Sequence, residues 1–233
     1  MRLRPHALAA LVTVLVPVLV ALLSAGCVGT AVPQPPGLDP IDPSQVSSHT
    51  MIDSPTVEGG PGAATPLAGA EVWIWNLERS TGPGRGPIAT DGSFTISFDH
   101  LAGDQLRLQV RTADDRSPPI DVLAPDGPVT PIEHPACLVA PVELDLGDAR
   151  AADLSLENDG CPGAIELDAV DLRVGEAALT ISGTTRASIP DGSRVDVHLS
   201  ASGNGAVEDI LFLHVTIDGV PDRLAVSVSV PAR

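Results

Sequence analysis

The chain has 233 residues, and its 30 acidic and 13 basic side chains give a formal net charge of −17 at pH 7. A surface this acidic repels nucleic acid and anionic lipid headgroups, so we expect no nucleic-acid partner. Glycine and proline together supply 45 residues (22 + 23), yet 43% of the chain is apolar. That combination is typical of many short strands joined by tight turns and argues against a disordered chain.

The first 26 residues have the layout of an export signal. Two arginines, Arg2 and Arg4, precede the apolar run Ala7–Leu23, and small residues lead from it straight into Cys27. The run is only about long enough to span a bilayer core, and Pro17 weakens any permanent helix there. The residues alone leave three outcomes open: cleavage with lipid attachment, ordinary cleavage with secretion, and an uncleaved anchor helix.

The sequence Leu23-Ser24-Ala25-Gly26-Cys27 resembles the lipobox of bacterial lipoproteins, with Ser24 where that family prefers leucine. In the family, signal peptidase II cuts before a cysteine that already carries a diacylglyceryl group. The resemblance implies that residues 1–26 are a signal peptide and that an acylated Cys27 holds the protein on a membrane, at about 0.8 kcal/mol per buried methylene. Val28 in place of aspartate implies, by the family's sorting rule, an outer-membrane lipoprotein of the bacterial cell envelope.

Residues 27–54 are predicted to be the lipidated cysteine and a disordered, proline-rich tether. Five prolines occur between Val28 and Ser54, and no apolar periodicity accompanies them. Such a segment cannot bury enough apolar surface to fold by itself. As a flexible chain, its 27 residues would span about 29 Å, which would hold a folded domain clear of the membrane.

Residues 55–128 show the two-residue alternation of half-buried antiparallel strands and form the first predicted domain. Every second residue of Ser93–Phe98 is polar, and Asp91-Gly92 before it supplies a turn. The segments GAEVWIWN, TDGSFTISF and GDQLRLQVR resemble the bacterial Ig-like and carboxypeptidase-regulatory-like repeats of surface proteins. The resemblance implies a turn at Asp91-Gly92, Phe94 in the core, and a non-catalytic module that presents, spaces or binds.

A short proline-bearing joint at residues 129–135 separates this domain from a second one at residues 136–233. The segments LDLG, LSLENDG, IPDGSRVDVHLS and GAVEDILFLHV occur there in that order. This ordered set resembles the abnormal-spindle/Hydin type of Ig domain, a relative of the major-sperm-protein fold. The predicted fold class is therefore all-β, with two consecutive Ig-like β-sandwich domains after a signal peptide and a disordered tether.

Two cysteines remain after Cys27, and one leftover pair in an exported protein most often forms a disulfide. If Val139–Leu146 and Ala152–Asn158 form a hairpin, facing residues have numbers that sum to about 298, and Cys137 and Cys161 also sum to 298. The two thiols would then lie opposite each other. We predict a Cys137–Cys161 disulfide that contributes about 3 kcal/mol.

Trp73 and Trp75 are the two tryptophans of the chain. If Val72 and Ile74 face the core, both indoles lie on the outer face of one strand, where paired aromatics can form a ligand platform. The sequence leaves open that the joint or the second domain covers them, or that the strand faces the other way. An exposed pair would favour the alternative function of a glycan-recognition module for cell-wall or exopolysaccharide chains.

Motifs for a serine hydrolase elbow, a zinc protease, a phosphate-binding loop and a calcium loop are all absent from the sequence. Asp99-His100 and Asp114-Asp115 are interpreted as solvated turn residues. His134 lies three residues before Cys137, but a disulfide explains an exported cysteine better than a nucleophile paired with a base.

His198 and His214 each lie on a predicted strand and face away from its aliphatic side. If the two strands were neighbours, the imidazoles could meet across the outer face. Two histidines without a third ligand make a poor metal site. We therefore predict no metal and no cofactor.

The sequence thus predicts a lipid-anchored, non-enzymatic envelope protein for display, adhesion or scaffolding. Its expected partners are the membrane, through acylated Cys27, and envelope proteins or polysaccharide. A second alternative is an enzyme of unrecognised type, with carboxylates such as Glu166 and Asp168 in a shallow site.

Overall fold

The structure is a computed structural model that describes residues 37–50 and 54–232. The predicted signal peptide, the lipidated Cys27 and the start of the tether lie outside the described residues. Within the described ranges, no helix has the length and apolar content needed to cross a bilayer.

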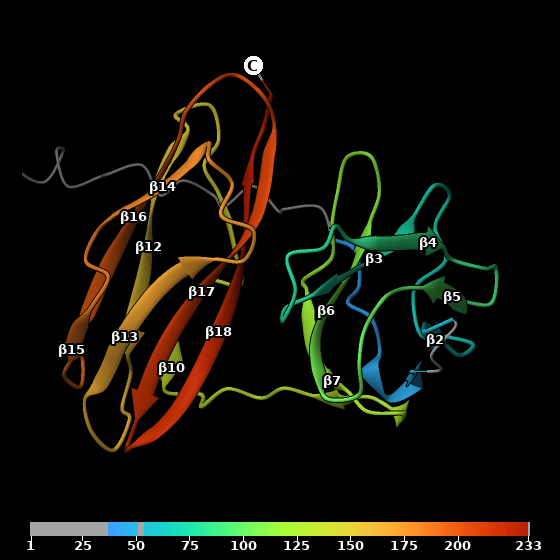
Figure 1. The fold of residues 1–233 in the computed structure, drawn as a ribbon, viewed down its shortest axis with the longest axis horizontal. Helices are drawn as coiled ribbons and strands as arrows, with labels where there is room; N and C mark the ends of the chain where they lie inside the picture. The colour runs from blue at the N-terminus through green and yellow to red at the C-terminus, as the bar shows by residue number, and fades with distance from the viewer. Residues whose placement is uncertain (1–36, 51–53, 233) are drawn as a thin grey trace, which may run out of the picture. The chain divides into compact units, whose positions relative to one another are not determined.

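The regular elements of the described residues are β-strands with one short 3₁₀ turn, and they build two sandwiches that each enclose a separate apolar core (Figure 1). This confirms the predicted all-β class with Ig-like sandwiches. Alternation explains the result, because each strand turns every second side chain toward the facing sheet.

The first sandwich pairs a sheet of strand order β5-β2-β1-β8 with a sheet of order β4-β3-β6-β7-β9. Its core contains the predicted aromatic Phe94, together with the fully buried Val72, Ile74 and Leu106. The elements are η1 (Pro43–Gln45), β1 (Val46–His49), β2 (Thr56–Gly59), β3 (Glu71–Asn76), β4 (Gly84–Pro87), β5 (Phe94–Ser97), β6 (Asp104–Arg111), β7 (Ile120–Ala124), β8 (Gly127–Pro128) and β9 (Thr130–Pro131).

The turn predicted at Asp91-Gly92 is present. Asp91 Oδ1 accepts hydrogen bonds from Ser93 N at 3.0 Å and Ser93 Oγ at 2.7 Å, and these bonds lower the pKa of Asp91. Gly92 has φ of 85°, and a Cβ there would collide with the Ala64 carbonyl. Glycine is therefore required at this turn for both conformation and space.

The tether prediction is wrong for residues 37–50. Ile41 and Val46 are each 2% exposed in the core of the first sandwich, and β1 pairs with both β2 and β8. β2 follows β1 closely along the chain, but β8 lies far from it in sequence. The segment has no clear apolar periodicity of its own, so the sequence pattern did not predict a strand here. The first domain accordingly begins before the predicted boundary at residue 55.

The predicted joint at residues 129–135 is also partly structured. Val129 is buried, and β9 pairs with β7, Pro131 lying opposite Val122. Pro131 fits this edge strand because an edge tolerates the loss of a backbone donor. The connection that remains between the sandwiches is correspondingly short.

The second sandwich pairs a sheet of order β10-β12-β16-β14 with a sheet of order β11-β18-β17-β13-β15. Its fully buried residues include Leu154, Leu156, Val197 and Leu213. The elements are β10 (Leu138–Val139), β11 (Glu143–Asp145), β12 (Ala151–Asn158), β13 (Ile165–Leu172), β14 (Leu179–Gly183), β15 (Ala187–Ile189), β16 (Arg194–Ala201), β17 (Val207–Ile217) and β18 (Val220–Val230).

The predicted hairpin of Val139–Leu146 with Ala152–Asn158 is wrong in most of its length. Only β10 pairs with β12, with Leu138 opposite Asn158. The numbers of facing residues therefore sum to 296, whereas the predicted hairpin had a sum of 298. The chain then crosses to the other sheet, where β11 runs parallel to β18. The segment is therefore shared between both sheets.

Candidate functional site: the interface between the sandwiches

The outer face of the sheet β4-β3-β6-β7-β9 packs against β17 and β18 of the second sandwich. Trp75 and Leu77 from the first sandwich join Ile210, Phe212 and Ala225 from the second in one buried cluster. This cluster is separate from the two cores. The interface therefore has an apolar centre of its own, as a specific contact between domains requires.

Trp73 and Trp75 lie on the outer face of β3, because Val72 and Ile74 face the core and are fully buried. Trp75 is only 7% exposed, and Trp73 is half-buried with its ring centre 5.8 Å from that of Trp75. Of the alternatives that the sequence left open, coverage by the second domain is the one found, and the exposed tryptophan platform is not. The second sandwich covers these indoles because that contact removes a large apolar area from water.

Arg111 stacks on both indoles. Its guanidinium carbon lies 4.9 Å from the ring centre of Trp73 and 4.6 Å from that of Trp75, within the range of a cation–π interaction. Its Nη1 also donates to both carboxylate oxygens of Glu208, at 3.0 and 2.8 Å. Arg111 thus links β6 of the first sandwich to β17 of the second.

Arg107 is the buried cation of the interface, with 2% of its surface exposed. Its Nε and Nη2 each donate to one oxygen of Asp121 at 2.7 Å. Across the interface, Nη1 donates to Ser227 Oγ at 2.9 Å and Nη2 donates to the Ala225 carbonyl. A buried guanidinium is tolerated when its charge is paired and its donors are used.

A third arginine, Arg173, binds a loop of the first sandwich. Nη1 of Arg173 donates to the carbonyls of Asn76, Arg79 and Thr81, at 3.3, 2.6 and 2.9 Å. Burial lowers the pKa of Arg173, and the nearby charge of Asp209 acts in the opposite direction. Arg173 therefore links the end of β13 to the loop that follows β3.

Further polar contacts surround the apolar centre, because the rim of an interface is commonly polar. They join Gln109 to Glu143 at 2.6 Å, Arg116 to Ser229 at 2.8 Å, and Arg223 to Gln105 at 2.6 Å and to Glu78 at 2.5 Å. The contact is thus specified by many individually placed groups.

The connection between the sandwiches is pinned by His134. Its Nδ1 lies 2.9 Å from Asp222 Oδ2 on β18. The hydrogen bond to Asp222 raises the pKa of His134 against the opposing effect of burial. Burial tends to raise the pKa of Asp222, but the bond and the charge of His134 outweigh it and leave that pKa below its usual value. His134 therefore acts as a structural partner of Asp222.

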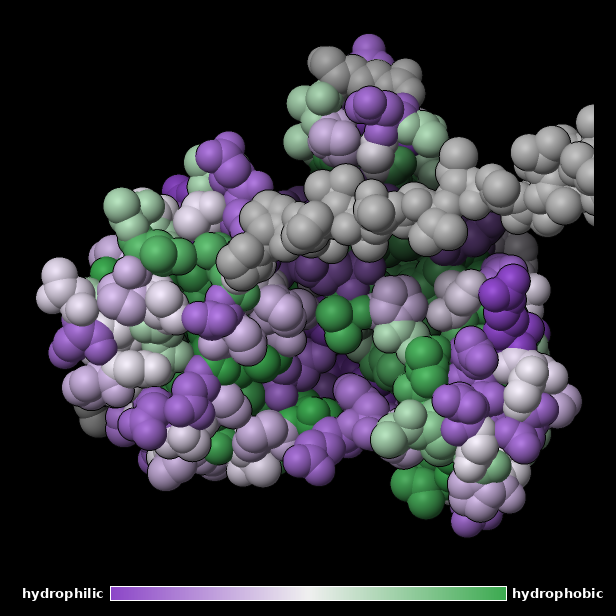
Figure 2. All heavy atoms as spheres, turned by 180° about the vertical axis from the view of Figure 1, so that it is seen from behind, coloured by the Kyte–Doolittle hydropathy of each residue, from purple (hydrophilic) through white to green (hydrophobic). Residues whose placement is uncertain are grey.

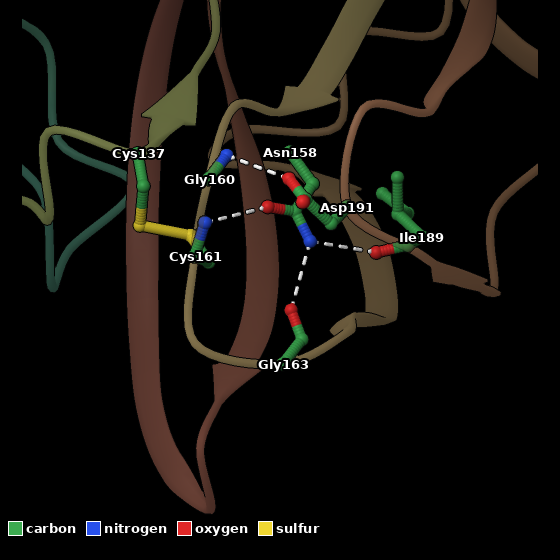
Figure 3. Close-up of a disulfide and its surroundings, with 7 residues drawn as sticks. All are labelled: Cys137, Asn158, Gly160, Cys161, Gly163, Ile189 and Asp191. Carbon is green, nitrogen blue, oxygen red and sulfur yellow. Dashed lines mark hydrogen bonds between the residues drawn. A yellow bond between two sulfur atoms is a disulfide. The ribbon is translucent and has the colours of Figure 1, made fainter.

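The Cys137–Cys161 disulfide is present, with an S–S distance of 2.02 Å. Beside it, the amide of buried Asn158 donates to the carbonyls of Gly163 and Ile189 at 2.9 and 3.0 Å and accepts from Cys161 N (Figure 3). The bond and this asparagine together hold three loops at one end of the second sandwich.

The two histidines singled out on strands do not meet. His198 lies on β16 and His214 on β17, which belong to different sheets. Each instead faces a carboxylate, with His198 Nδ1 2.7 Å from Asp153 and His214 Nε2 3.4 Å from Asp171. The expectation that they could approach each other is wrong because the sandwich separates their strands.

The remaining candidates are dispersed. Asp99 is exposed and pairs with Arg79 at 3.1 Å, but His100 is 1% exposed with Nδ1 2.8 Å from the Phe98 carbonyl. The prediction that His100 is solvated is therefore wrong, because its ring stacks against Phe98. Asp114 and Asp115 are exposed in the loop between β6 and β7, as predicted.

Glu166 and Asp168 face outward on β13 and bind hydroxyl groups of neighbouring strands. Glu166 accepts from Ser188 at 2.6 Å and Asp168 from Thr216 at 2.7 Å. A polar hollow of about 260 Å³ lies elsewhere, lined by residues 111–116 and Glu208. In residues 37–50 and 54–232, no group of three or more His, Cys, Asp or Glu side chains could hold a metal ion.

Polar and apolar residues are interspersed over the face seen in Figure 2. The exposed large apolar residues are scattered through the described sequence: Leu67, Leu101, Leu123, Val139, Val142, Val174 and Val220. Single exposed apolar residues of this kind are normal on protein surfaces.

No protein-family model and no curated protein matches the chain. Among solved structures, the Vibrio cholerae VesB protease is similar at 11% identity and a TM-score of 0.36, over 72% of this chain and 67% of that one. The D0-D1 domain of intimin is similar at 11% identity and a TM-score of 0.26, over 82% of this chain and 94% of that one. A titin I-band fragment is similar at 9% identity and a TM-score of 0.25, over 79% of this chain and 64% of that one. Scores this low carry no argument about activity.

Proposed function

We propose that this protein is a lipid-anchored, non-enzymatic component of the bacterial cell envelope, in the outer membrane, that displays two joined sandwiches for adhesion or scaffolding. The observation that carries the proposal is the interface around Trp75 and Arg107, which uses one face of each sandwich to fix the two together. The other sheet faces and the interstrand loops are then available for contact with envelope proteins or polysaccharide.

Two features of the chain support export to an oxidising compartment. The Cys137–Cys161 disulfide is of a kind that persists outside the reducing cytosol. The lipobox-like sequence that ends at Cys27 supplies the anchor in this proposal. Glycan binding through Trp73 and Trp75 is not retained, because the second sandwich covers Trp75.

Mass spectrometry of the protein from the native membrane fraction tests the anchor. We expect a chain that begins at Cys27 and carries the added mass of a diacylglyceryl group. The Cys27→Ser variant should leave the membrane fraction, because the lipid supplies the membrane affinity. A Cys27→Ser protein that stays membrane-bound would contradict the lipid anchor and leave the two sandwiches unaffected.

A further inference from the structure

β14 is an edge strand with an open side. The order β10-β12-β16-β14 places β16 on one side of it and no strand of the described part on the other. Figure 1 shows β14 at the margin of the second sandwich. An edge strand offers free backbone N–H and C=O groups, which proteins commonly protect with charge, proline or a covering segment.

β14 has neither charge nor proline, and no other strand of the described residues covers its edge. The nine residues Ala177–Thr185 contain no charged residue and no proline, and threonine and isoleucine there favour strands. Among the other edges of the described sheets, β4, β8 and β9 contain proline, β11 carries two carboxylates, and β10 and β15 have two and three residues. The edge of β5 is covered by β4, where a Cβ on Gly86 would lie 3.0 Å from Ile96 and 3.6 Å from the Thr95 carbonyl.

The free groups of β14 can be assigned from the hydrogen bonds of its neighbour. Ala201 of β16 donates to the Arg150 carbonyl, on the side of β12. Backbone groups of successive residues in a strand point to opposite sides, so Ser200 points toward β14, where it pairs with Thr180. The N–H and C=O of Ile181, the next residue, therefore point away from the sheet.

We propose that β14 is a self-association surface, on which a second copy of this chain adds its own β14 antiparallel with Ile181 opposite Ile181. A residue opposite its own copy exchanges two N–H···O bonds in the hydrogen-bonded type of pair. This arrangement would use both free backbone groups of Ile181 in each copy. It joins two four-stranded sheets about a two-fold axis, which is the commonest symmetry of protein dimers.

The charge pattern favours a second copy over an unrelated strand. Glu176 lies five residues before Ile181, and Arg186 lies five residues after it. An antiparallel copy therefore brings Glu176 to the end of the strand where Arg186 of the partner subunit lies. Because the stretch between them is uncharged, two chains of net charge −17 can meet here without like charges in opposition. The inference goes beyond the proposed function and does not depend on the lipid.

Paired cysteines test both the contact and its register. In this register Thr180 lies opposite Ser182 of the partner subunit, with Cα atoms about 4.5 Å apart, which a disulfide can bridge. The full chain with Cys27→Ser serves as the parent, so that the introduced cysteine is the free thiol. We expect a disulfide-linked dimer when the Thr180→Cys and Ser182→Cys variants are mixed and oxidised, and several-fold less from either variant alone.

The matched control is the pair Thr95→Cys and Ser97→Cys on β5, where both side chains are exposed but β4 covers the edge. Equal crosslinking in the control pair or in the single variants would overturn the proposal, as would crosslinking only to another protein.

Light scattering of the parent should give the mass of a dimer. The Thr180→Glu/Ser182→Glu variant should be monomeric, because carboxylates then face each other across the axis. A dimer that persists in that variant, or a monomeric parent, rejects β14 as the contact.

Discussion

At the scale of single residues, Arg107 connects the two sandwiches most directly. Desolvating a guanidinium costs several kcal/mol, and Asp121 on the neighbouring strand offsets that cost. The remaining donors bind Ser227 and Ala225 of the other sandwich. Removing Arg107 would leave the Asp121 charge without its partner inside the interface.

We expect Arg107→Ala to lower the free energy of unfolding by about 3–5 kcal/mol, measured by urea denaturation with tryptophan fluorescence. The Arg107→Ala/Asp121→Ala double variant should cost less than the sum of the single variants, because they share one interaction. Arg194→Ala, on an exposed position of β16, is the control and should change stability by less than about 0.5 kcal/mol. A cost for Arg107→Ala no larger than the control would contradict its role in the interface.

At the scale of elements, β10 shows how a very short strand is kept in place. It pairs with β12 through only two residues, Leu138 and Val139, which is too short a ladder to be stable alone. The disulfide fixes the chain just before it, and Asn158 fixes the facing loop. The position of β10, the first strand of the second sandwich, therefore depends on the disulfide and on Asn158.

Replacing both Cys137 and Cys161 by serine should lower the free energy of unfolding by about 3 kcal/mol, because the unfolded chain regains the freedom of the closed loop. Calorimetry of oxidised parent, reduced parent and double-serine variant measures the effect. Reduced parent and variant should agree with each other. A double-serine variant as stable as the oxidised parent would show that the disulfide does not secure β10.

At the scale of the whole molecule, the buried cluster around Trp75 makes the two sandwiches thermodynamically dependent on each other. Unfolding either one would expose the apolar surface and the buried charge of the other. Domains joined by a large specific contact unfold together, while loosely linked domains unfold separately.

We therefore expect one unfolding transition for the parent chain, with tryptophan fluorescence and far-ultraviolet circular dichroism giving the same midpoint. Trp75→Ala removes the centre of the cluster, and we expect it to separate the two midpoints. Leu123→Ala, at an exposed position on β7, is the control that should keep them together. Two separate transitions in the parent would contradict the coupling.

Much of the local structure could be predicted from the sequence, because strands and turns depend on near neighbours. The alternation around Phe94 and the turn at Asp91-Gly92 follow from side-chain periodicity and from the conformational freedom of glycine. The cysteine pair is predicted by its compartment and its spacing. The register used to support it was not correct, because the numbers of facing residues sum to 296 and not to 298. The alternation also places Trp73 and Trp75 on the outer face of β3.

The sequence by itself determined the all-β class and the core faces, because these depend on local pattern. It also determined the disulfide, because only Cys137 and Cys161 follow Cys27 in the chain. Only the tertiary structure decided what covers an outer face. Alternation turns Arg107 and Trp75 away from their own core, but nothing near them in sequence reveals that β18 and β17 lie opposite. Such contacts join residues more than one hundred positions apart in the chain. They can form, and stabilise the protein, only after both sandwiches have folded and come together.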